Sequence, residues 1–141
     1  MFFWKKNLPI INNKISNYYL PVIMQSNWFF LSKSYFTAIR LNVIETLHNK
    51  IFINIHDMHG KNKYLNNIKS IKKFFLDEYI HESIFEKTIN SFSICQDMKN
   101  CDLIKKDYVI SETPMIIMYC NSNIYQFSIS YDNNICNMIN N

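Results

Sequence analysis

Three side chains that could bind a metal or move a proton lie close together at residues 53–64, in the stretch INIHDMHGKNKY. His56, Asp57 and His59 fall just before Gly60, the only glycine of the chain. A zinc site takes four protein ligands, or three and a water when it is catalytic, and imidazole and carboxylate groups are among its donors. These three residues are therefore candidate metal ligands, and His56 and His59 are candidate catalytic residues. The alternative is a polar hairpin turn in which Gly60 supplies a positive φ.

A third candidate catalytic residue is His81, which lies close in sequence to Glu78 and Glu82. A carboxylate beside an imidazole can orient it for proton transfer, although a solvated helix face explains the same residues without any chemistry. His48 follows an expected helix and is interpreted as a cation that caps the helix carboxyl end. The chain contains no GxGxxG, GxxxxGK[ST], GxSxG or HExxH motif, and a single glycine excludes Gly-rich phosphate loops. We therefore expect no cofactor.

The elements that would position these residues follow from the spacing of apolar side chains. Helical spacing predicts a helix over 32–47, and a strongly amphipathic pattern over 68–90 predicts one helix, or two with a break near Asp77 or Glu78. Alternation in KIFINIHD predicts a strand that continues through DMHGK into KNKYLNNI as a hairpin.

The remaining elements are read in the same way. Alternation also predicts a strand over 91–97, followed by a short helix or turn in MKNCDLIKKDY. A second hairpin is expected over 108–132, with MIIMYC as a central strand and a turn at 121–123. Residues 1–14 are expected to form an irregular arm, and a helix is expected to start at Ile15 and stop before Pro21. The order predicts a single α+β domain over 1–141: a mostly antiparallel sheet of about five strands with two or three helices packed on it.

Composition limits the class of protein. With 141 residues, 48% of them hydrophobic, the chain can bury the core of one domain. Its abundant Asn, Ile, Lys and Tyr match codons rich in A and T. The net charge of +4 is diffuse and includes one arginine, Arg40, which argues against specific nucleic-acid recognition.

Three sequence features bear on the compartment of the protein: its cysteines, its N-terminus and its longest apolar runs. There is no CxxC pair, no secretory signal order, and no apolar run long enough to span a membrane. We therefore expect a cytoplasmic protein whose cysteines are mainly small core residues, namely Cys95, Cys101, Cys120 and Cys136.

These observations favour a role without catalysis, as an accessory protein, adaptor or dedicated chaperone. The partner would be another protein or a second copy of the chain. Alternation in IYQFSISY places Tyr125, Phe127 and Tyr131 on one face of a strand. Exposed aromatic residues are enriched at interface cores, so these three are the candidate partner-binding residues.

An alternative is a small acyl-transferring enzyme. The order of helix, NKIFINIHDMHGKNKY hairpin, helix, strand and helix over about residues 25–106 loosely resembles the toxin-activating lysine acyltransferases. That resemblance implies a fold related to N-acetyltransferases. The family carries a histidine in a Ser-Pro-x-His-Arg stretch ahead of its first strand, whereas this chain has VIMQSNWFF there. The general base that the resemblance implies is therefore missing.

Overall fold

The computed structural model describes residues 18–56, 67–120 and 122–128, and the chain separates into two compact units. The helical unit is Pro21–Tyr108, and the other unit contributes a β-hairpin. Whether they form the single expected domain over 1–141 stays a prediction. The expected arm at 1–14 lies outside the described residues. In the part of the chain that is described, no helix is both long and apolar enough to cross a membrane.

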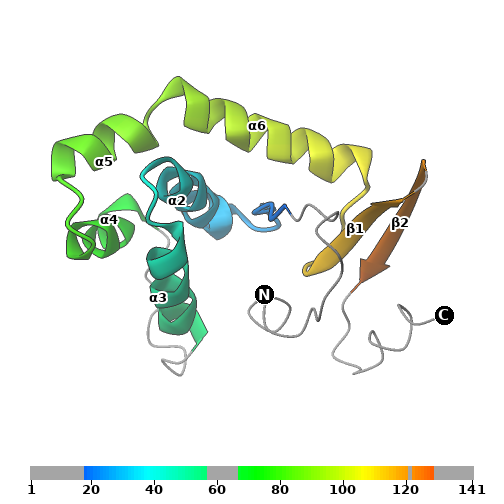
Figure 1. Ribbon diagram of the computed structural model, residues 1–141, viewed down its shortest axis with the longest axis horizontal. Helices are drawn as coiled ribbons and strands as arrows, with labels where there is room; N and C mark the ends of the chain where they lie inside the picture. The colour runs from blue at the N-terminus through cyan, green and yellow to red at the C-terminus, as the bar shows by residue number, and fades with distance from the viewer. Residues whose placement is uncertain (1–17, 57–66, 121, 129–141) are drawn as a thin grey trace. The chain divides into compact units, whose positions relative to one another are not determined.

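The described residues of the helical unit form one short 3-10 helix and five α-helices. Helix α2 contacts each of the other four α-helices and lies amid them in Figure 1. The elements are η1 (Ser26–Trp28), α2 (Phe29–Arg40), α3 (Ile44–His56), α4 (Ile68–Asp77), α5 (Glu82–Ile89) and α6 (Phe92–Asp107).

The core of this unit is apolar and draws on four helices. Its centre is the pair Phe75 of α4 and Phe85 of α5, both fully buried, with ring centroids 4.7 Å apart. The other buried members of the cluster are Ala38, Leu47, Ile71 and Ile89. Burial of such side chains contributes about 1.5–3 kcal/mol each, so this cluster is the main source of the unit's stability.

The predicted α+β fold with a sheet of about five strands is therefore wrong. The structure is mostly helical, and its described strands form one antiparallel pair. The first predicted strand, in KIFINIHD, is the second half of α3. Ile51 and Ile55 are four residues apart, a spacing that satisfies both a strand period of two and a helix period of 3.6. Leu47 lies one turn earlier and is almost fully buried, so it extends the four-residue spacing of Ile51 and Ile55. The interpretation as a strand did not take this residue into account.

The predicted strand over 91–97 is also wrong, because the segment begins α6. The Ser91 side chain accepts a hydrogen bond from the Ile94 backbone N–H at 3.4 Å and caps the helix. Ile94, Met98 and Cys101 are buried at i, i+4 and i+7, which is one face of a helix. The short helix or turn expected in MKNCDLIKKDY is the continuation of this same helix.

The predicted helix over 32–47 is two helices, α2 and α3, separated by a tight turn. Asn42 has φ 56°, and the backbone N–H of Val43 donates to the Ala38 carbonyl at 2.9 Å. This six-to-one bond is the Schellman arrangement that ends helices, usually with glycine in the left-handed position. Asparagine tolerates that position better than other residues with a Cβ, and here it replaces glycine.

Of the two alternatives for 68–90, one helix or two with a break near Asp77 or Glu78, the structure has the second, as α4 and α5. Tyr79 takes φ 60° at the break, and the N–H of Ile80 donates to the Phe75 carbonyl at 3.1 Å. The Tyr79 side chain is 98% exposed, so packing does not compensate for the left-handed backbone.

The predicted second hairpin is found, but MIIMYC is one of two paired strands among the described residues and not the central strand that was expected. Strand β1 (Met115–Cys120) pairs antiparallel with β2 (Asn123–Ser128), with Cys120 opposite Asn123 across the expected turn. The Thr113–Pro114 peptide before β1 is cis.

Candidate functional site

The histidine cluster that opened the sequence analysis falls mostly outside the described residues. His56 is the last residue of α3, whereas Asp57 and His59 are not described. Within 18–56, 67–120 and 122–128, no group of three or more metal-ligating side chains comes together. The metal and catalytic roles of these three residues stay predictions. The structure does change their setting, because His56 ends a helix and does not lie on a strand.

His81 caps the amino end of α5. Its Nδ1 accepts a hydrogen bond from the Ser83 backbone N–H at 3.3 Å and lies 2.9 Å from the Ser83 hydroxyl. The two flanking acids pair with lysines instead: Glu78 with Lys50, and Glu82 with Lys72. The hydrogen bond from Lys50 lowers the pKa of Glu78, and the one from Lys72 lowers the pKa of Glu82. The structure thus gives His81 a capping contact, while each of the two acids is paired with a lysine.

His48 lies within α3 and is half-buried, so the prediction that it follows a helix end is wrong. Its ring is 6.0 Å from Tyr35 in an edge-on arrangement and 6.4 Å from Phe52 in a stacked one, measured between centroids. Burial lowers the pKa of His48 below its ordinary value of 6.5. The imidazole therefore packs among aromatic rings in a setting that favours its neutral form.

The hairpin carries two of the three candidate partner-binding residues. Tyr125 is 44% exposed and faces Met118 across the strand pair, and the partly buried Phe127 faces Ile116. Tyr131 lies outside the described residues. A partner surface at this hairpin stays a prediction.

The cysteines differ in accessibility, which corrects the expectation that they are mainly core residues. Cys95 on α6 and Cys120 at the end of β1 are exposed free thiols, and Cys101 on α6 is buried. Burial raises the pKa of the Cys101 thiol to about 11, so this thiol stays protonated near neutral pH and is a poor nucleophile. Cys136 is outside the described residues.

Cys95 and Cys101 cannot pair with each other while α6 is intact. Six helical residues rise by roughly 9 Å, whereas disulfide-linked Cα atoms are at most about 7 Å apart. A disulfide at Cys95 therefore needs a sulfur from outside α6.

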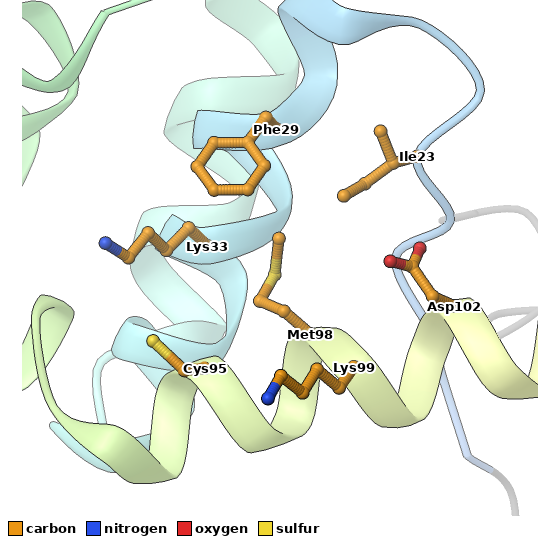
Figure 2. A pocket seen from close by; sticks show the side chains of 7 residues that line it. All are labelled: Ile23, Phe29, Lys33, Cys95, Met98, Lys99 and Asp102. Atoms are coloured by element: carbon orange, nitrogen blue, oxygen red, sulfur yellow. The ribbon is translucent and has the colours of Figure 1, made fainter.

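Cys95 lines a surface pocket between α2 and α6, which we call the α2–α6 pocket. Its volume is about 430 Å³, and its lining residues are Ile23, Phe29, Lys33, Cys95, Met98, Lys99 and Asp102. The last four lie at i, i+3, i+4 and i+7 on α6 and so share one face of that helix. Figure 2 shows Lys33 and Phe29 on α2 facing this row, with Ile23 on the segment before η1.

Three polar contacts hold the pieces of chain around the pocket. Arg40 of α2 pairs with Asp97 of α6 at 2.6 Å. The Lys33 ammonium donates to the Asn90 side-chain oxygen at 3.3 Å, just before α6. Near the other end of α6, Lys105 donates to the Ile23 carbonyl at 2.7 Å.

The pocket combines apolar side chains with charged side chains whose charges do not balance. Among the apolar ones, Met98 is 8% exposed and Phe29 is 43% exposed. Two ammonium groups, of Lys33 and Lys99, line the pocket against the single carboxylate of Asp102. The arrangement presents an accessible thiol, an apolar contact surface and an excess of positive charge.

Sequence reasoning missed this pocket. Reading 91–97 as a strand removed Cys95 from the row that it forms with Met98 and Lys99. The serine ahead of an apolar residue at 94 was the local signal for a helix start.

Comparison with solved structures finds similar chains, among them two crystal structures of DsbA. The chain matches the crystal structure of Pseudomonas aeruginosa DsbA E82I with a TM-score of 0.72 and 25% identity, over 89% of this chain. It matches the crystal structure of Pseudomonas aeruginosa DsbA with a TM-score of 0.70, also at 25% identity over 89% of the chain. The chain spans 63% and 61% of the length of these two structures. No protein-family model matches the sequence, and neither does a curated protein.

The match overturns both functional predictions made from the sequence. DsbA exchanges thiols and disulfides through a reactive cysteine in a Cys-x-x-Cys motif, so it is neither an accessory protein without catalysis nor an acyltransferase. The present chain resembles that fold but contains no Cys-x-x-Cys.

Proposed function

We propose that the chain is a relative of the thioredoxin-like thiol–disulfide oxidoreductases and exchanges thiols with disulfides through one cysteine, Cys95. The observation that carries this proposal is the structural match to DsbA over 89% of the chain. Cys95 is the thiol chosen because it is exposed, is free and lines a pocket. Cys101 is buried and its raised pKa keeps it protonated, and Cys120 lies on the hairpin outside the pocket.

The reaction proceeds in two exchanges that balance without an external oxidant. Cys95 loses its proton to solvent, and its sulfur attacks one sulfur of a disulfide R–S–S–R′. The Cys95–S–S–R bond forms, the original S–S bond breaks, and R′–S⁻ leaves and takes a proton from solvent. A second thiol, R″–SH, then attacks the mixed disulfide, releases R–S–S–R″ and restores the Cys95 thiol. The absence of a Cys-x-x-Cys is why this second thiol is a separate molecule.

The test is catalysis of exchange between a neutral disulfide and a thiol. Reduction of bis(2-hydroxyethyl) disulfide by excess reduced glutathione is followed as mercaptoethanol released, with and without the full chain. We expect a rate above the uncatalysed one that Cys95→Ser abolishes and that Cys120→Ser leaves unchanged. A Cys95→Ser protein as active as the unaltered chain would overturn the assignment.

The partner and the compartment belong to the same proposal. The disulfide acted on is carried by another protein or by a small molecule, and Tyr125 and Phe127 of the hairpin are proposed to contact a protein partner. We retain the cytoplasm as the proposed location, since free thiols persist in reducing compartments. Fractionation of cells that produce the chain checks this: its recovery with an oxidising compartment, with Cys95 in a disulfide, would contradict it.

A further inference from the structure

The charges around the α2–α6 pocket point to the class of disulfide that it takes. Lys99 lies one helical turn after Cys95 on the same face of α6, and Lys33 reaches the pocket from α2 (Figure 2). Among the described residues, Lys99 makes no ion pair within 4.0 Å. Lys33 contacts a neutral amide oxygen, so its positive charge is not neutralised there. Both charges remain to attract an anion.

The negative charge in the pocket is a single carboxylate, that of Asp102, and it lies farther from the Cys95 thiol along α6 than the Lys99 ammonium does. Asp102 is seven residues after Cys95, which places it two turns away, whereas Lys99 is one turn away. Asp97 also lies near Cys95 in sequence, but it pairs with Arg40 at 2.6 Å. Of the charged residues that line the pocket from α6, Lys99 is therefore nearer to Cys95 along the helix than Asp102 is.

The apolar residues define the rest of the ligand. Ile23, Phe29 and Met98 line a pocket of about 430 Å³, which accommodates a small molecule or a short peptide segment. Such a surface contacts a carbon chain, and the ammonium groups attract its negatively charged ends.

We propose that the α2–α6 pocket binds a small disulfide that carries carboxylates, held by Lys33 and Lys99 so that its sulfurs lie against Cys95. This inference rests on the proposed function, because it names the substrate class of that same thiol. The step is the first exchange described above: the carboxylate-bearing half becomes linked to Cys95, and the other half leaves as a thiolate.

The experiment measures how fast Cys95 forms a mixed disulfide with reagents of different charge. The reduced full chain is mixed with oxidised glutathione, which is anionic, with neutral bis(2-hydroxyethyl) disulfide, or with cationic cystamine. Adducts are quantified by intact mass and located by peptide mapping. A ligand that binds before it reacts makes the rate saturate with concentration, so we expect saturation with oxidised glutathione.

Two matched charge variants separate the pocket from general electrostatics. Lys99→Gln removes a pocket charge, and Lys87→Gln removes an exposed charge in the last turn of α5, outside the pocket. We expect Lys99→Gln to slow the reaction with oxidised glutathione by a factor of about three to ten, less so at high salt, and Lys87→Gln to leave it nearly unchanged. Relative to the rate with the neutral reagent, the rate with oxidised glutathione should fall in Lys99→Gln and stay nearly constant in Lys87→Gln, and the relative rate with cystamine should rise in Lys99→Gln.

The outcomes distinguish this inference from the proposed function. If Cys95 forms adducts with all three reagents and neither lysine variant alters the order of their rates, the carboxylate preference is wrong while thiol exchange stands. If Cys95 forms no adduct with any reagent while Cys120 does, the proposed function is wrong and the inference falls with it.

Discussion

Truncation of one core aromatic residue tests the helical packing on which the pocket depends. Phe85 is fully buried against Phe75, with ring centroids 4.7 Å apart. Phe85→Ala removes this contact and leaves a cavity, which costs about 3–5 kcal/mol of unfolding free energy for a phenylalanine in a core. Because whole domains are stable by only about 5–15 kcal/mol, this loss is a large part of the total.

The neighbouring residue provides the matched control. Ile84 lies on the same helix and is 51% exposed. Ile84→Ala therefore also replaces an apolar side chain by alanine, but it removes little buried apolar surface. We expect that variant to cost under about 1 kcal/mol. Urea unfolding followed by far-ultraviolet circular dichroism gives both values, and an unchanged slope shows that stability alone has altered. Equal costs for the two variants would refute the packing of α5 through Phe85.

Three further predictions concern a titrating ring, a helix cap and a strained turn. Burial lowers the pKa of His48 below 6.5, so the unfolded chain binds a proton there more readily, and stability falls as pH drops below about 6.5. The difference between the melting temperatures at pH 7.5 and pH 5.5 should therefore be smaller in His48→Gln than in the unaltered chain. An equal difference in the two proteins would contradict this. Ser91→Ala removes the cap that accepts from Ile94 N–H and should cost about 1 kcal/mol, whereas Ser91→Asp should cost little; chemical denaturation checks both. Tyr79→Gly relieves the backbone strain of an exposed residue at φ 60° and should raise the unfolding free energy by about 1 kcal/mol. A lower unfolding free energy in chemical denaturation would contradict the left-handed turn.

Some elements were predictable because their local signals agreed. The segment 68–90 combines an amphipathic pattern with polar residues at the break, and α4 and α5 are found there. The second hairpin combines two apolar alternating runs with Asn and Ser between them. In both cases spacing and turn chemistry indicate the same structure.

Other elements were mispredicted because two periods fit the same residues. Ile51 and Ile55 suit a strand and a helix equally, and only the buried Leu47 one turn earlier decides between them. The scarcity of glycine removed the usual signal for helix ends, because Asn42 and Tyr79 take the left-handed positions. Without those signals, the apolar pattern over α2 and α3 predicted one helix followed by a strand.

The candidate site itself depends on contacts between distant parts of the chain. Lys33 and Cys95 are 62 residues apart and meet because α2 packs against α6. No spacing rule brings them together, so the pocket required the structure. What the sequence did contain is the row of Cys95, Met98 and Lys99 at helical spacing.

Cys95 is proposed as the exchanging thiol of a chain with a DsbA-like fold. The most direct test is the time course of mixed-disulfide formation in the native, reduced chain exposed to oxidised glutathione, with each cysteine-containing peptide quantified by mass spectrometry. We predict that the peptide carrying Cys95 is modified first, and that Cys101 is modified only after denaturant is added. Modification of Cys120 or Cys136 ahead of Cys95, or equal rates at all cysteines, would contradict the account.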